Sequence, residues 1–156
     1  MRSAELRTGR VFVLKLDEGE VLNEVVESFC RDNGIVRATV SAVGGASDSS
    51  ILVVGPELPI RDRISPQTCS PDGPCELTAF GTVFPDSDGN PVMHMHGSLG
   101  RSGGSVTGCF RKGVVVWLTM EVVVTELLGE GPARTASDPR LDGKLLEIRR
   151  WHRKRF

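Results

Sequence analysis

Apolar and polar residues alternate, or β-branched residues cluster, in several short stretches of this chain, which is the pattern of β-strands. The stretches that predict strands are 11–16, 35–43, 51–54, 76–84, 92–99, 105–110, 114–125 and 144–148. Apolar residues recur instead at helical spacing at Val21, Leu22, Val25, Val26, Phe29 and Cys30. One helix among many strands predicts an α+β fold, with a mostly antiparallel β-sheet and one main amphipathic helix at about residues 20–32.

Flanking residues predict where this helix begins and ends. Asp17 and Glu20 have the spacing of a capping box, with Asp17 as the N-cap. Asn33 and Gly34 follow the last apolar position, and glycine suits the left-handed conformation that often ends a helix. Cys30 lies on the apolar stripe, so we expect its side chain in the core.

Two segments lack the pattern of either element. Residues 55–75 hold five of the nine prolines, which makes regular structure improbable, and residues 129–138 also predict a loop. A loop as long as 55–75 in a small domain is usually functional or mobile. Cys69 and Cys75 lie at its end, and they are either a labile disulfide or two unrelated thiols.

Length and composition are those of one globular domain followed by a short tail. The chain has 156 residues, of which 39% are hydrophobic and 25% charged, and we place the single domain at residues 1–148. The first residues carry charges and no apolar signal segment. The longest apolar run, 114–118, is too short to cross a bilayer. We therefore expect a cytoplasmic protein with no membrane partner.

The stretch 92–110 predicts two strands joined by a glycine-rich turn. Alternate side chains of a strand share a face, so His94 and His96 point to the same side of the sheet. If residues 101–104 form the loop, counting back from it places His96 opposite Cys109. A loop one residue longer or shorter would turn Cys109 to the other face, unless a bulge restored the pairing.

Two imidazole nitrogens and one thiolate sulfur suit a divalent metal of the zinc type. Three protein ligands leave one coordination position for water, a substrate or a fourth ligand. The pattern thus indicates a metal site at His94, His96 and Cys109. The alternative is two histidines that bond to backbone groups on a half-buried sheet face, beside a small buried cysteine.

Two further groups of residues carry candidate chemistry. Glu121 is the one acid among the valines of 114–125, and it is a candidate general acid or base, or a further ligand. The last eight residues contain no acid and five of the 19 basic residues. These candidate DNA-binding residues are Arg149, Arg150, Arg153, Lys154 and Arg155. With the aromatic residues among them they could contact phosphates and stack on bases, and the alternative is a solvated tail.

Six motifs, in this order, resemble the plants-and-prokaryotes conserved (PPC) domain. They are Leu16-Asp-Glu-Gly-Glu-Val-Leu, Val40-Ser-Ala-Val-Gly-Gly-Ala, Leu77-Thr-Ala-Phe-Gly-Thr-Val, Pro91-Val-Met-His-Met-His-Gly-Ser-Leu, Gly108-Cys-Phe and Met120-Glu-Val-Val-Val. The resemblance covers about residues 10–127, which makes that stretch the core of a PPC-like domain. It implies a compact antiparallel sheet with a flanking helix, generally assembled as a homotrimer.

The resemblance also bears on the metal site. The family usually completes the site with a third histidine in a Gly-Gly-His segment, whereas this chain has Thr107-Gly-Cys. Cysteine can replace histidine on zinc, and its thiolate adds a negative charge. The hairpin also resembles that of acetolactate decarboxylase, which holds zinc with a His-x-His pair and a later histidine.

Two functions therefore remain open, and the sequence does not decide whether the protein is an enzyme. The first is a DNA-associated or regulatory homotrimer that carries a divalent metal. The family's DNA-binding label comes from plant members with a preceding AT-hook, and this chain has Thr8-Gly-Arg-Val and no such element. The second is a zinc-dependent enzyme that binds a small oxygenated metabolite, with Glu121 moving a proton.

Overall fold

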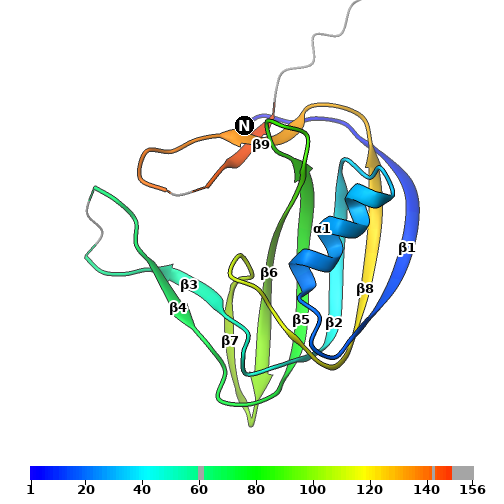
Figure 1. The fold of residues 1–156 in the computed structure, drawn as a ribbon. Helices are drawn as coiled ribbons and strands as arrows, with labels where there is room; N and C mark the ends of the chain where they lie inside the picture. Colours follow the sequence, from blue (N-terminus) through cyan, green and yellow to red (C-terminus); the bar gives the residue numbers. More distant parts are fainter. Residues whose placement is uncertain (60–61, 142, 149–156) are drawn as a thin grey trace, which may run out of the picture.

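The computed structural model describes residues 1–59, 62–141 and 143–148, and Figure 1 shows how their elements are arranged. The helix is α1 (Leu22–Asp32). The strands are β1 (Arg7–Asp17), β2 (Ala38–Ala46), β3 (Leu52–Pro56), β4 (Pro66–Cys69), β5 (Cys75–Pro85), β6 (Pro91–Arg101), β7 (Gly104–Cys109), β8 (Val116–Leu128), β9 (Pro132–Ala136) and β10 (Leu145–Ile148). The described helix is too short and too polar to cross a membrane.

Eight of the strands form one sheet in the order β1-β8-β2-β5-β6-β7-β3-β4, and β9 and β10 form a second sheet of two strands. Every strand pair in the described residues is antiparallel. One helix with a mostly antiparallel sheet confirms the predicted α+β fold. Strand β8 pairs with β1 on one side and with β2 on the other. Its many β-branched residues suit such a central strand.

Strands occupy parts of both segments that we expected to be irregular, so that prediction was wrong. Strand β4 pairs with β3 at the edge of the large sheet. An edge strand needs hydrogen bonds on one side only, which is why proline is tolerated there. Strand β9 lies within the predicted loop 129–138 and pairs with β10, the predicted last strand. All four cysteines are free thiols, Cys69 and Cys75 included.

Helix α1 lies across one face of the large sheet (Figure 1). Its apolar stripe buries Leu22, Val26 and Cys30 completely, which confirms the core position predicted for Cys30. The helix ends as the sequence indicates. Gly34 adopts a φ of 65°, and the Ile35 N–H donates to the Cys30 carbonyl at 2.8 Å, as in a Schellman motif.

The start of the helix differs from the prediction. The Asp17 N–H donates to the Glu20 carboxylate at 2.8 Å, as in a capping box. However, Asp17 ends β1, and α1 begins only at Leu22, after Val21 as N-cap. The intervening residues pair with the start of β8, where the Val116 N–H donates to the Glu20 carbonyl at 2.9 Å. Backbone pairing with a strand therefore displaced the predicted N-cap.

The two faces of the large sheet differ in what covers them. The face under α1 carries the core, including Leu16, Val40, Met95, Val122 and Val124. The opposite face, here called the open face, exposes apolar side chains: Val11 (59%), Val13 (74%), Val43 (51%) and Phe80 (63%). Cross-strand pairing puts Val13, Val123, Ser41, Phe80, His96 and Cys109 in one row across this open face.

Candidate metal centre and adjacent pocket

Strand β6 presents both histidines on the open face. His94 and His96 are exposed, whereas Met95 between them is 1% exposed and points into the core. On β5, Thr82 lies opposite His94 and Phe80 lies opposite His96. The alternation of side chains along a strand therefore brings the two imidazoles together, as the sequence predicts.

The β6–β7 turn is tighter than expected, but it keeps the predicted pairing. The outer two residues of the predicted loop 101–104 pair with each other. The inner two, Ser102 and Gly103, have φ of 51° and 79°, which is the conformation of a type I′ hairpin turn. Shortening the loop symmetrically leaves the register unchanged. His96 therefore lies directly opposite Cys109, as predicted.

Packing under the hairpin fixes the end of β7 against β6. The Phe110 N–H donates to the Met95 carbonyl at 3.0 Å, at a point between the two histidines. The Phe110 side chain is 1% exposed. A Cβ atom at Gly97 would lie 2.4 Å from Phe110 Cζ, so the ring needs a glycine there. This contact holds the preceding residue, Cys109, beside β6.

The three candidate ligands converge on one point. His94 Nε2 and His96 Nε2 are 3.2 Å apart, and the ligand atoms of both histidines and Cys109 lie within 4.8 Å of one another. Two nitrogens bound tetrahedrally to zinc at about 2.0–2.1 Å would lie about 3.3 Å apart, so the spacing of the two imidazole nitrogens fits that ion. The two nitrogens can also share a hydrogen bond when one ring carries the proton. A proton and a metal ion therefore compete for this pair.

In the part of the chain that the structure describes, this is the one cluster of three histidine, cysteine or acidic residues able to hold a metal. Its electrostatic surroundings favour the neutral form of the His94 imidazole. Partial burial lowers the pKa of His94, and the nearby charges of Arg134 and Arg111 lower it further. A neutral ring can bind a cation, whereas a protonated one cannot.

Arg134 is the residue that the sequence did not indicate. It comes from β9, is 5% exposed, and donates from Nη2 to Thr82 Oγ1 at 2.8 Å and from Nε to the Val92 carbonyl at 3.2 Å. Since Thr82 lies opposite His94, Arg134 reaches the side of the cluster. A lone arginine in a segment taken for a loop gives no local signal of burial.

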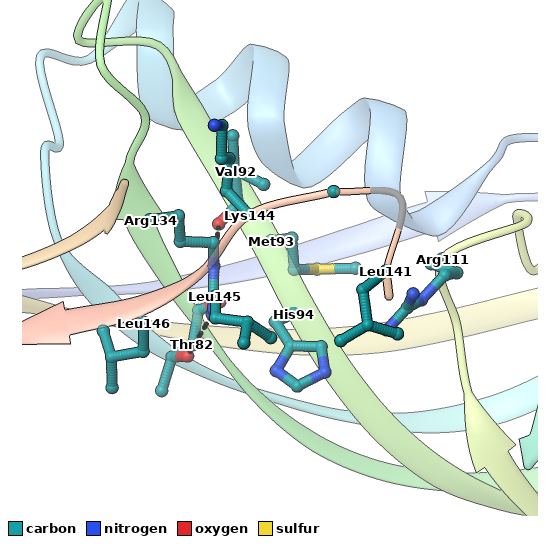
Figure 2. Close-up of a pocket in the computed structure, with 11 residues that line it drawn as sticks. Thr82, Val92, Met93, His94, Arg111, Arg134, Leu141, Lys144, Leu145 and Leu146 are labelled. Atoms are coloured by element: carbon teal, nitrogen blue, oxygen red, sulfur yellow. Dashed lines mark hydrogen bonds between the residues drawn. The ribbon is translucent and has the colours of Figure 1, made fainter. Parts of the chain in front are cut away.

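A pocket of about 520 Å³ lies between the end of the large sheet and the β9–β10 hairpin. Figure 2 shows His94 within this pocket, together with the side chains of the segment before β10. Its described lining contains three basic residues and no acid; it consists of Thr82, Val92, Met93, His94, Arg111, Arg134, Leu141, Gly143, Lys144, Leu145 and Leu146. One candidate ligand therefore faces a cavity large enough for a small molecule.

The chain matches the family model of the Plants and Prokaryotes Conserved (PCC) domain, the family introduced above as PPC, over residues 3–128. This match spans most of the chain. The protein belongs to the PPC-domain family. The resemblance that the six motifs predicted is thus confirmed, and no curated protein matches the chain.

Solved structures of PPC-like proteins resemble this one over nearly their whole length. A metal-containing protein from Archaeoglobus fulgidus is 28% identical, with a TM-score of 0.78 over 96% of this chain and 100% of the other. A PPC protein from Pyrococcus horikoshii is 26% identical, with a TM-score of 0.76 over 93% and 97%. A candidate DNA-binding protein from Ralstonia eutropha is 19% identical, with a TM-score of 0.66 over 88% and 90%, and shares the fold.

Glu121, the other candidate residue that the structure of this PPC-domain protein describes, lies away from the cluster. Glu121 is on β8, opposite Lys15 and Val43. Since β2 and β5 separate β8 from β6, about 14 Å of sheet lies between Glu121 and the histidine strand. The structure does not bring Glu121 to the cluster within one chain. The basic residues Arg149, Arg150, Arg153, Lys154 and Arg155 lie outside the described residues.

Proposed function

We propose that this PPC-domain protein binds one divalent metal ion of the zinc type through His94, His96 and Cys109. The observation that carries the proposal is the convergence of two imidazole nitrogens and a sulfur within 4.8 Å, from two paired strands. A bound zinc ion would supply Lewis acidity at an open coordination position. The chain itself supplies the rest: β6 orients the imidazoles, and the Gly97–Phe110 contact holds Cys109.

Metal analysis of purified protein tests this proposal directly. We expect about one zinc per chain in the wild type and a loss of most of it in His96→Ala and Cys109→Ala, because two ligands rarely suffice. Cys69→Ala is the matched control, since Cys69 is a free thiol outside the cluster. Equal metal content in all four proteins would contradict the proposal.

We also propose that the protein assembles as a homotrimer in the cytoplasm. Family resemblance implies the trimer, and the exposed apolar residues of the open face support an interface there. A free thiol among the ligands suits a reducing compartment. Sedimentation of the wild type should give three times the chain mass of 16.9 kDa.

A pair of exposed valines tests which surface forms the interface. Val13→Glu places a charge on the open face and should shift the mass toward that of one chain. Val36→Glu is the control, because Val36 is exposed but precedes β2. A monomeric wild type, or a trimer that Val13→Glu leaves intact, would contradict this part of the proposal.

The proposed role of the assembly is DNA-associated or regulatory. Its support is the basic segment beyond residue 148, the boundary that we propose for the domain, because several copies in one oligomer would add their weak phosphate contacts. Deletion of residues 149–156 should weaken binding to duplex DNA and flatten its salt dependence. Unchanged affinity and salt slope after the deletion would exclude this mechanism.

The pocket favours a second candidate function, a zinc-dependent enzyme that acts on a small oxygenated metabolite. His94 both belongs to the cluster and lines the pocket, so a small molecule there could reach the open coordination position. We keep Glu121 as the proposed proton-transfer group of this candidate. Its distance from β6 within one chain means that it would act across a subunit contact. An enclosed metal that no small molecule reaches would exclude this function.

A further inference from the structure

Arg134 is a buried cation that has no carboxylate partner among the residues that the structure describes. Its side chain is 5% exposed, and its described hydrogen-bond acceptors are the carbonyls of Val92 and Thr82 and the Thr82 hydroxyl. The guanidinium lies 5.5 Å from the centre of the Phe84 ring. Burial lowers its pKa, and the nearby charge of the Cys109 thiolate opposes part of that effect. Buried charges in proteins are usually paired with an opposite charge, because desolvation is costly.

Two more cations face the same pocket from other elements. Arg111 follows β7, Lys144 precedes β10, and both side chains are exposed. Among the described residues, neither makes a hydrogen bond or an ion pair. No acid belongs to the described lining, so among the described residues no carboxylate lines the pocket beside these three cations. A bound metal would add further positive charge, since one thiolate offsets only half of a divalent ion.

The rest of the lining is apolar. Leu141, Leu145 and Leu146 come from the segment before and within β10, and Val92 and Met93 come from β6. Leu145 is 42% and Leu146 44% exposed. Figure 2 shows Leu141 and Leu145 near His94, with Leu146 on the far side of Thr82. The pocket thus joins an apolar wall to a cationic one.

We propose that this pocket binds a small organic carboxylate, with the carboxylate among Arg111, Arg134 and Lys144 and its apolar chain against the leucines. A guanidinium presents paired donors that match a carboxylate, which gives this headgroup specificity beyond charge alone. The pocket volume of about 520 Å³ suits a molecule of this class. The position of the bound carboxylate beside a metal ion rests on the proposed function. Anion binding by the three cations does not require the metal.

Calorimetric titration of the full chain tests the inference, with pentanoate as the probe and pentanamide as its neutral analogue. We expect pentanoate to bind at least about tenfold more tightly than pentanamide. Arg111→Gln and Lys144→Gln should each weaken pentanoate binding about fivefold to tenfold. Lys112→Gln is the matched control, because Lys112 is exposed in the same loop and does not line the pocket. It should change the affinity less than twofold.

Three outcomes separate this inference from the metal proposal. Equal affinities for pentanoate and pentanamide in protein that contains zinc would overturn the inference and leave the metal site standing. Pentanoate binding that depends on Arg111 in protein that takes up no zinc would support the pocket and refute the metal site. Tighter binding of inorganic phosphate than of pentanoate, with the same dependence on Arg111 and Lys144, would overturn the carboxylate assignment.

Discussion

The two hairpins that meet at the candidate centre are held in different ways. The β6–β7 hairpin is part of the large sheet, and its pairing runs unbroken from the turn to His96 and Cys109. The β9–β10 hairpin forms a separate sheet with a register shift between Leu145 and Glu147. Arg134 joins it to the large sheet through Thr82 and Val92. The ligands are therefore placed by local pairing, and Arg134 by long-range packing.

The largest effect is expected from breaking the first hairpin at Gly97. In Gly97→Ala the new Cβ would lie 2.4 Å from Phe110 Cζ and 2.6 Å from the Ala79 Cβ. Overpacking of this kind costs about 2–3 kcal/mol, and the displaced Phe110 should carry Cys109 away from the histidines. Urea denaturation and metal analysis measure both effects.

Gly104→Ala is the control in the same hairpin, because the Cβ there would meet its nearest atom at an ordinary 3.6 Å. It should leave the unfolding midpoint and the zinc content nearly unchanged. Similar behaviour of the two alanine variants would show that the Gly97–Phe110 contact does not position Cys109.

Loosening the second hairpin should cost less stability and should leave the metal content unchanged. Arg134→Met removes hydrogen bonds to Thr82 and Val92 but also removes a buried charge, so we expect a net loss of about 1–2 kcal/mol. Zinc content should stay near that of the wild type, because no ligand comes from β9. Loss of zinc in this variant would mean that the hairpins do not act independently.

The ion pair between Arg10 and Glu126 lies outside both hairpins and should make the stability of the fold depend on pH. Hydrogen bonds from Arg10 lower the pKa of Glu126 to about 2 from an ordinary 4.5. The ionised carboxylate therefore stabilises the fold above about pH 4.5, and this stabilisation is lost as the pH falls toward 2. Glu126→Gln should lose stability at neutral pH and depend less on pH across this range. Urea unfolding at several pH values measures the free energy of unfolding of both proteins. The same pH dependence in the wild type and in Glu126→Gln would contradict this role of Glu126.

The smallest effect concerns His94, where the two hairpins meet. Since Arg134 and Arg111 contribute to its lowered pKa, Arg111→Gln should raise that pKa toward the ordinary 6.5. The folded, metal-free wild type should therefore protonate His94 at a lower pH than the variant. Nuclear magnetic resonance titration of the imidazole measures both midpoints. A lower midpoint in Arg111→Gln would refute this electrostatic account.

The same difference between the hairpins explains how much the sequence could reveal. Strand alternation and the symmetry of a short turn were enough to predict that His96 faces Cys109, because both rules act within a few residues. The apolar spacing of the helix and its terminal glycine were equally local. The predicted loop was two residues too long, but the register prediction still held. The extra pair, Arg101 with Gly104, shortens the loop symmetrically and leaves every side chain on its predicted face.

What the sequence could not reveal depends on contacts between distant segments. Arg134 is buried because β9 lies against β5, and nothing near residue 134 encodes that contact. The predicted N-cap at Asp17 failed for a similar reason, because residues near Glu20 pair with β8, almost a hundred residues later. The pocket combines residues from β5, β6, β9 and β10 with the segments that follow β7 and precede β10, so only the folded structure indicates it.

The most direct test of the metal centre is the absorption spectrum of the protein loaded with Co²⁺ in place of zinc. A tetrahedral site with one thiolate should give intense visible bands and a sulfur-to-cobalt charge-transfer band in the near ultraviolet. Cys109→Ser should lose the charge-transfer band, whereas Cys69→Ser should keep it. A wild-type spectrum without that band, or one that Cys109→Ser leaves unchanged, would contradict the claim that His94, His96 and Cys109 hold one ion.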